Sequence, residues 1–187
     1  FSVRDDDFLA RVNICLLGKF SIAVNGAVIS DNNWKTRKIE GILKYLILHR
    51  GKTITRESLM EIFWPGDKKS ASMSLRAALY ELRKVLARFE IPPDTLIQEK
   101  NGGLIVPASG TLFVDTDEFL SLYNELQKLP SSNSGSAQRL GILEKMVSLY
   151  KGNLLENDIY EDWTFFAREE FKSIYLEAAI SLASIYI

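Results

Sequence analysis

Apolar residues recur at spacings of three and four along Ser70–Arg88, which predicts an amphipathic helix. The expected inward stripe consists of Met73, Leu75, Ala78, Leu79, Leu82 and Leu86. Ser70 and Ser72 are the expected N-cap candidates. On the opposite face, small side chains lie toward the N-terminal end and basic ones toward the C-terminal end. That outward face consists of Ser74, Arg76, Ala77, Tyr80, Arg83 and Lys84.

Two shorter apolar stripes precede this helix. Thr36 is a plausible N-cap for a helix that runs to Arg50 and is ended by Gly51; its expected core residues are Ile39, Ile42, Leu43, Leu46 and Ile47. Thr55 caps a second, short helix, whose expected inward residues are Leu59, Ile62 and Phe63 and which Trp64-Pro65-Gly66 ends. Only a few residues then lead to Ser70, with Lys68 and Lys69 in the turn, so the pattern predicts a helix-turn-helix.

Two Asn-Gly pairs, each flanked by apolar runs, predict hairpins. The first, Asn25-Gly26, lies between the runs 20–24 and 27–29, and with the preceding run 12–17 it predicts two or three antiparallel strands. The second has the flanks 96–99 and 104–106 and the tip Lys100-Asn101-Gly102-Gly103. A hairpin directly after a recognition-type helix is the layout of a winged helix. Lys100 and Asn101 would then reach a minor groove or a phosphate, although a plain structural hairpin remains open.

From Asp115 onward the pattern is helical throughout. We expect one helix over Asp115 to about Leu129, a flexible loop over 130–136, and a helix over Ala137–Tyr150 with Lys151-Gly152 as its C-cap signal. A long helix follows from Ile159 or Tyr160 to Ile187, with its inward face supplied by Trp163, Phe166, Phe171, Ile174, Tyr175, Ala178, Leu182 and Ile185. This pattern fits an array of α-hairpin repeats.

We therefore predict an α+β winged helix-turn-helix with N-terminal antiparallel strands, followed by an all-α helical-repeat domain. The expected organisation is a lead-in over 1–11, a winged-helix domain over 12–113 and a helical domain over 114–187.

Composition describes an ordinary globular chain of 187 residues, but its charge is unevenly distributed. Residues 35–88 contain thirteen Lys and Arg against five Asp and Glu, an excess of eight positive charges. Residues 116–187 contain six basic and eleven acidic residues, an excess of five negative charges. This asymmetry predicts a basic half that binds nucleic acid and an acidic half that contacts proteins.

Other features narrow the class of protein. No apolar run reaches the ~20 residues of a membrane span, and the acidic start is unlike a signal peptide. The chain lacks an initiating Met, which suggests a fragment or a processed start. The single cysteine, Cys15, excludes an internal disulfide, fits a reducing compartment and is expected in the core. The single histidine, His49, cannot anchor an ordinary metal site and is expected as a cation at a helix C-terminus.

These elements suggest how the basic half would bind DNA. The N-terminal part of the Ser70–Arg88 helix would enter a major groove, where Arg can grip guanine O6 and N7. The expected base contacts are the six outward residues, Ser74, Arg76, Ala77, Tyr80, Arg83 and Lys84. The expected phosphate contacts are Lys35, Arg37, Lys38, Thr55, Arg56, Lys68, Lys69 and Ser72. A merely solvated basic face, and Arg83 as a structural ion-pair partner, remain the alternatives.

The order and spacing of these motifs resemble the Streptomyces antibiotic regulatory protein family. The matching stretches are Leu16–Phe20 with Asn25-Gly26; Arg37-Lys38, Leu43–Leu48, Arg50-Gly51, Thr55–Leu59 and Phe63–Pro65; Leu75–Leu86; and Val114-Asp115, Phe119, Leu149–Leu155 and Trp163. The chain departs at Leu104, where many members have an aromatic residue.

The resemblance implies an OmpR-type winged helix joined to a bacterial transcriptional activator domain, a tetratricopeptide-like module that is incomplete here. It further implies a cytoplasmic bacterial activator that binds tandem direct repeats in promoter DNA and contacts RNA polymerase. From the residues themselves, the acidic helical half could hold two copies together as a homodimer, and no cofactor and no membrane are expected.

An enzyme is not expected, because the chain lacks GxxxxGK[ST], GxSxG and HExxH motifs and has too few His and Cys for a metal cluster. A protein-interaction scaffold without DNA binding stays open, as does the output fragment of a larger, nucleotide-regulated STAND-type regulator.

Overall fold

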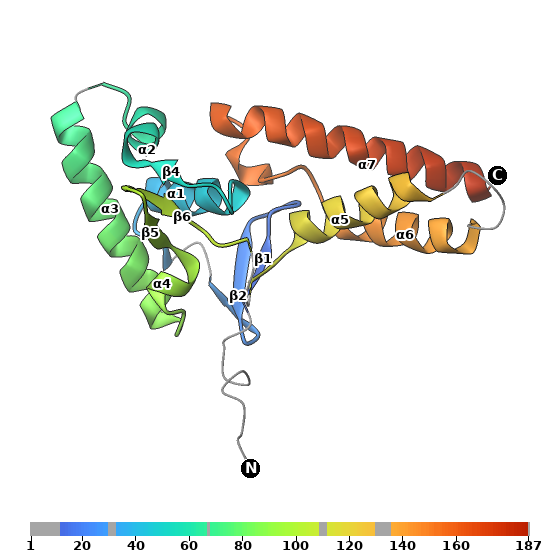
Figure 1. Cartoon of the computed structure of the whole chain (residues 1–187), viewed down its shortest axis with the longest axis horizontal. Coiled ribbons are helices and arrows are strands. Elements are labelled where there is room, and N and C mark those ends of the chain that lie inside the picture. Colours follow the sequence, from blue (N-terminus) through green and yellow to red (C-terminus); the bar gives the residue numbers. More distant parts are fainter. Residues whose placement is uncertain (1–11, 30–32, 67, 109–111, 130–135, 187) are drawn as a thin grey trace, which may run out of the picture. The chain divides into compact units, whose positions relative to one another are not determined.

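The computed structural model describes residues 12–29, 33–66, 68–108, 112–129 and 136–186 (Figure 1). The expected lead-in over 1–11 and most of the expected loop over 130–136 lie outside these residues. The chain divides into two compact units, Phe1–Asn13 with Ile22–Leu112 and Ile14–Ser21 with Phe113–Ile187. The fold is mixed: strands and a winged helix come first and a helical region follows.

The first strands are β1 (Val12–Cys15), β2 (Ser21–Val24) and β3 (Ala27–Ile29), and with β7 (Leu112–Val114) they give the order β3-β2-β1-β7. Strands β2 and β3 pair antiparallel, with Ile22 opposite Ile29. The turn residues Asn25 and Gly26 have φ values of 49° and 90°, the left-handed conformation of a two-residue hairpin turn. The first predicted hairpin is therefore confirmed. Cys15 was expected in the core, but it is only half-buried, so that expectation was wrong.

Helices α1 (Arg37–Leu48) and α2 (Arg56–Phe63) begin at the predicted caps. The Thr36 hydroxyl accepts from the Ile39 amide and the Thr55 hydroxyl from the Ser58 amide. The five residues expected in the core of α1 are all buried: Ile39, Ile42, Leu43, Leu46 and Ile47. In α2, Leu59 and Phe63 are buried, whereas Ile62 is half-buried. His49 is the C-cap of α1, and its Nδ1 lies 2.9 Å from the Tyr45 carbonyl oxygen.

Helix α3 (Lys68–Arg88) begins two residues earlier than predicted. Ser70 and Ser72 therefore lie inside its first turns and are not N-caps, and Lys68 and Lys69 belong to the helix instead of the turn. Met73 is 69% exposed, so its place in the apolar stripe was wrong. At ~100° per residue Met73 lies about 200° around the helix from Leu75. The buried residues of α3 are Ala71, Leu75, Ala78, Leu79, Leu82, Val85 and Leu86.

The wing is a three-stranded sheet in the order β4-β6-β5, formed by β4 (Ile54–Thr55), β5 (Gln98–Lys100) and β6 (Gly103–Ile105). Asn101 and Gly102 have φ values of 50° and 75°, which confirms the second hairpin. A Cβ on Gly103 would lie 2.5 Å from the Ile54 carbonyl oxygen, so only glycine lets β4 and β6 approach this closely. Leu96 was predicted in a strand, but it belongs to the short helix α4 (Pro93–Leu96). Proline is favoured at the first position of a helix, where Pro93 lies.

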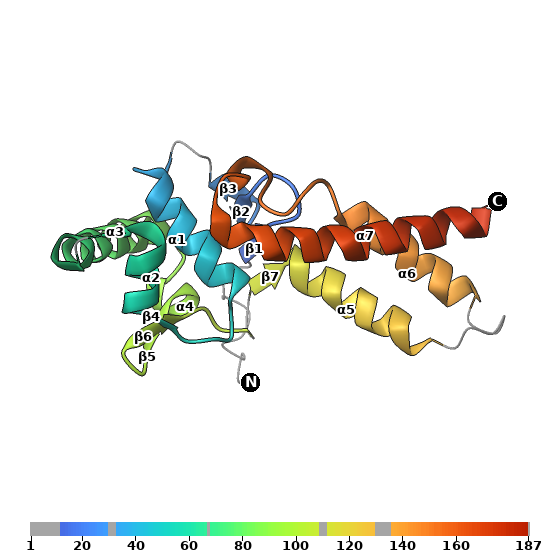
Figure 2. The ribbon, with the colours of Figure 1, turned by 90° about the horizontal axis from the view of Figure 1, so that it is seen from above.

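The helical unit contains α5 (Asp115–Lys128), α6 (Ser136–Leu149) and α7 (Phe165–Tyr186), and α6 contacts both other helices (Figure 2). The 3-10 turns η4 (Glu156–Asp158) and η5 (Asp162–Thr164) precede α7, so the last helix starts later than predicted. Phe171 and Ala178 are buried as expected, but Phe166 is 84% exposed and Ile185 is 45% exposed. Those two assignments to the inward face were wrong.

A buried carboxylate holds the start of this unit together. Asp115, only 5% exposed, accepts hydrogen bonds at 2.9 Å from the backbone amides of Leu16 and Leu17. The Leu155 amide in turn donates to the Leu16 carbonyl at 2.8 Å, and the Gly18 amide donates to the Asn153 carbonyl at 3.1 Å. These bonds fix the segment Ile14–Ser21 to the helices of the same unit, although about 90 residues of sequence separate this segment from the start of those helices.

The turn after α6 depends on close packing and on a buried arginine. A Cβ on Gly152 would lie 3.2 Å from the Gly18 Cα, and Gly152 has no left-handed φ, so its predicted role as a C-cap was wrong. Arg168 donates to the carbonyls of Leu154, Asp158 and Ile159 at 2.9–3.3 Å and to the Thr164 hydroxyl. These bonds satisfy backbone groups that irregular chain would otherwise leave without partners.

The Asp115→Ala variant should lose about 2–4 kcal/mol of the free energy of unfolding, because it leaves two buried amides without their charged acceptor. Urea denaturation followed by far-UV circular dichroism would measure the change. The control is Glu125→Ala, which removes an exposed carboxylate of the same helix that accepts one hydrogen bond from Gln138. The control should change the free energy by less than ~0.5 kcal/mol. Equal effects of the two variants would contradict this role of Asp115.

Candidate nucleic-acid interface

A groove of about 650 Å³ lies between α2 and α3. Among the residues that line it are five that the sequence analysis assigned to DNA contact: Arg56, Ser72, Arg76, Tyr80 and Arg83. Glu57 and Met60 of α2 and the buried Leu75 and Leu79 complete the lining. The sequence analysis assigned these side chains to two separate helices. The helix-turn-helix geometry brings them together in one groove.

The outward face of α3 is well exposed beside this groove. Arg76, Ala77 and Lys84 are exposed, and Tyr80 is 66% exposed. Ser74 is half-buried at the edge of this face. These residues are close in space because positions three, four and seven apart share one side of a helix.

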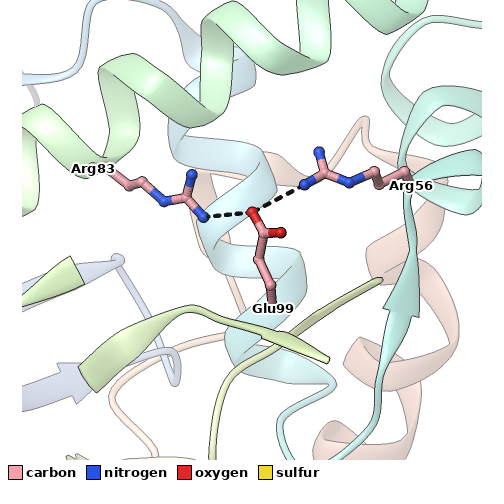
Figure 3. A network of polar contacts seen from close by, with 3 residues as sticks. All are labelled: Arg56, Arg83 and Glu99. Atoms are coloured by element: carbon pink, nitrogen blue, oxygen red, sulfur yellow. Dashed lines mark hydrogen bonds and ion pairs between the residues drawn. The ribbon is translucent and has the colours of Figure 1, made fainter. Parts of the chain in front are cut away.

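Arg56 and Arg83 meet at a single atom of the wing (Figure 3). The Nη2 atom of Arg83 lies 3.0 Å from Glu99 Oε1, and the Nη2 atom of Arg56 lies 3.1 Å from the same oxygen. The Arg83 side chain is thus an ion-pair partner within the protein, which the sequence analysis had kept as the alternative to a base contact. The hydrogen bond from Arg83 and the positive charge of Arg56 hold the pKa of Glu99 below its ordinary value.

Two lysines expected at phosphates have partners within the protein. Lys38 Nζ donates to the Phe63 carbonyl at 2.7 Å and lies 5.1 Å from the centre of the Trp64 ring. It therefore binds the C-terminal end of α2, where a cation is favourable. Lys35 Nζ lies 3.5 Å from Glu81 Oε1 of α3, an exposed pair of the kind that contributes little stability.

The remaining expected contacts lie at helix starts and at the wing tip. Arg37 is exposed at the first position of α1, and Thr55 is the N-cap of α2. Lys69 is exposed in the first turn of α3, and Lys68 is its first residue, but the Lys68 side chain lies outside what the structure describes. Lys100 ends β5, and Asn101 forms the exposed turn.

Glu99 is the residue of this site that sequence reasoning missed. Its two arginine partners are 16 and 43 residues away, and no local pattern indicates such a pairing. The three residues of the strand around Glu99, Gln98–Lys100, are all exposed. In the sequence, such polar residues indicate only a strand in contact with solvent. Within the described residues no group of three or more His, Cys, Asp and Glu could hold a metal ion, and no helix is long and apolar enough to cross a membrane.

Comparison with known proteins places this site in a regulatory context. Residues 33–103 match the family model described as "Transcriptional regulatory protein, C terminal". Most of the chain is similar in fold to the solved structure of Mycobacterium tuberculosis EmbR in complex with a low-affinity phosphopeptide, with a TM-score of 0.76 and 17% identity. That similarity covers 93% of this chain and 45% of the EmbR chain, so this chain spans under half of EmbR. No curated protein sequence matches the chain.

The family match covers α1, α2, α3 and the wing through the start of β6. The EmbR similarity, at so low an identity, shows the fold alone. The family match supports a DNA-binding, transcription-regulatory winged-helix domain over residues 33–103.

Replacement of Arg83 by Ala should raise the pKa of the Glu99 carboxyl toward its ordinary value, because the hydrogen bond from Arg83 is the largest cause of the lowering. The lowered pKa means that the ion pair is intact above the ordinary Glu range and is lost as the pH falls through the lowered value. A carboxyl-detected NMR titration would measure both pKa values. Lys128→Ala, which removes an exposed cation of the helical unit, is the control and should leave the pKa of Glu99 unchanged. An identical Glu99 pKa in both proteins would contradict the contact.

Proposed function

We propose that the chain is a sequence-specific, DNA-binding transcription regulator that places the N-terminal half of α3 in the major groove. The observation that carries this proposal is the groove between α2 and α3, which is lined by five of the residues expected to contact DNA. Both helices lie in the segment that matches the family model for transcriptional regulatory proteins. The exposed face of α3 beside the groove supplies a convex surface of the width that a major groove accepts.

Base contacts would come from the outward residues of α3. Arg76 is exposed and can form a bidentate contact with guanine O6 and N7. Ala77 and Tyr80 offer apolar surface to a thymine methyl group, while Ser74 and Lys84 flank them. Arg83 must first exchange its ion pair with Glu99 before it can contact DNA.

Phosphate contacts would come from residues at the helix starts and the wing. The assignment covers Arg37, Thr55, Arg56, Lys68, Lys69 and Ser72, with Lys35 available after its exposed pair opens. Lys100 and Asn101 would approach an adjacent minor groove or phosphate. Lys38 is instead assigned to holding the end of α2, because its ammonium group is already engaged with the Phe63 carbonyl and the Trp64 ring.

We further infer that the regulator is a cytoplasmic bacterial activator without catalytic function, and that it binds tandem direct repeats in promoter DNA. A single winged helix buries little surface and reads few base pairs, so a second copy on an adjacent repeat would add specificity. The helical unit, a tetratricopeptide-like bacterial transcriptional activator domain in this proposal, would contact RNA polymerase or a second copy. Its excess of acidic residues keeps it away from the DNA backbone.

A second candidate is a protein-interaction scaffold without DNA binding. The observation that favours it is a set of large apolar side chains exposed on the helical unit: Tyr160 at 92%, Phe166 at 84% and Ile180 at 67%. Exposed apolar groups of this size are typical of protein contacts. The chain could also be the DNA-binding output part of a longer, nucleotide-regulated protein, in keeping with its coverage of under half of EmbR.

Selection of bound sites from random duplex DNA near physiological salt should enrich a direct repeat spaced by about one helical turn. On that enriched site, Arg76→Ala should weaken binding by about 1–3 kcal/mol in a fluorescence titration, because a bidentate base contact is lost. Lys128→Ala, which removes an exposed cation from the helical unit, is the control and should leave affinity within a factor of two or so.

Binding without enrichment would reduce the proposal to a non-specific basic surface. The absence of any binding would favour the scaffold.

A further inference from the structure

Arg56 of α2 and Arg83 of α3 both point toward Glu99 of the wing (Figure 3). Arg56 is the first residue of α2, Arg83 belongs to the C-terminal half of α3, and Glu99 lies in β5. Both guanidinium groups use one nitrogen, Nη2, and both contact the same oxygen, Oε1 of Glu99. A single acceptor atom therefore defines where two cationic donors converge.

The two arginine side chains are more buried than the Glu99 side chain that they contact. The arginine side chains are 32% and 35% exposed, whereas the Glu99 side chain is 57% exposed. The two cations are thus held by surrounding structure, and the carboxylate between them is the more solvated group. Two guanidinium groups so close repel one another unless an anion lies between them. The pair is consequently a site for an anionic oxygen, whichever molecule supplies it.

We propose that Arg56 and Arg83 form an arginine fork for one anionic oxygen, that Glu99 fills this fork in the DNA-free protein, and that a backbone phosphate of duplex DNA displaces Glu99 on binding. The DNA part of this inference rests on the function proposed above. Glu99 is then a positioning residue, which holds both guanidinium groups ready for a phosphate and competes with that phosphate. Arg83, although it belongs to the outward residues of α3 considered for base contacts, then binds the DNA backbone instead of a base edge.

The chemistry of the site favours phosphate as the replacement. Arginine binds phosphate oxygens through charge-assisted hydrogen bonds, and two arginines on one oxygen leave further N–H donors for its neighbours. The fork opens on the groove between α2 and α3, which also contains Ser72 and Arg76. The exposed carboxylate is displaced at little free-energy cost, since exposed ion pairs contribute little stability.

Displacement has a measurable consequence for affinity. In the wild-type protein a phosphate must exchange with Glu99 and remain near its negative charge. Glu99→Gln keeps the side-chain length and a carbonyl oxygen but removes that charge. The variant should therefore bind duplex DNA roughly three- to tenfold more tightly at low salt. Its affinity should also fall more steeply with salt, by about one unit of slope, because one more positive charge is available for phosphate.

The test compares Glu99→Gln with the control Glu90→Gln, which removes an exposed carboxylate that makes no ion pair in the described residues. Each substitution is made in the wild-type chain and in an Arg56→Ala, Arg83→Ala background, and a fluorescent duplex is titrated at several salt concentrations. We expect tighter binding only for Glu99→Gln, and only while both arginines are present. Equal gains for both glutamates, a gain that persists without the arginines, or no gain would overturn the proposal.

A readout without DNA separates this inference from the proposed function. Inorganic phosphate is titrated into each protein while the side-chain Nε–Hε NMR signals of Arg56 and Arg83 are followed. Phosphate should shift both signals in Glu99→Gln at concentrations that leave the wild-type signals in place. If these shifts occur but no variant binds duplex DNA, the fork stands and the proposed function fails. If phosphate shifts neither signal in Glu99→Gln, the fork itself is wrong.

Discussion

The buried stripe of α3 is the constraint on which the candidate DNA interface depends. Its leucines pack in the winged-helix core, where α3 contacts both α1 and α2. Burial of each such side chain contributes about 1.5–3 kcal/mol, more than the ~1 kcal/mol of an exposed ion pair. The apolar stripe therefore sets the rotation of α3 about its axis, and the charged side chains adjust to that rotation. Arg76 and Tyr80 face outward because Leu75, Leu79 and Leu82 face inward.

Charge in the winged helix is partly engaged within the protein. Lys38 binds a backbone carbonyl, and Arg56 and Arg83 share Glu99. The excess of positive charge over 35–88 thus overstates what is immediately available to DNA. These engagements differ in kind: the Lys38 contact closes the end of a helix, whereas the exposed Glu99 carboxylate can be exchanged for another anion. A count of basic residues in the sequence cannot distinguish the two.

Much of the fold could be predicted because its signals are local. Thr36 and Thr55 cap helices within three residues of themselves, and Asn25-Gly26 and Asn101-Gly102 have the φ values that their turns require. The errors arose where tertiary packing decides. Phe166 lies in an apolar run but faces outward, and the two-residue strand β4 exists only through its pairing with β6. Met73 was an error of a different kind, because a position about 200° from Leu75 cannot share its face of the helix.

The candidate site was predictable to the same extent. Its helices and most of its basic residues follow from local patterns, but the Glu99 bridge depends on pairing across 16 and 43 residues. The most direct test of the central claim, that α3 reads the major groove, is methylation interference on the enriched DNA site. Methylation of guanine N7, which lies in the major groove, should block binding at positions that Arg76→Ala no longer discriminates. Interference confined to adenine N3, which lies in the minor groove, would contradict the account.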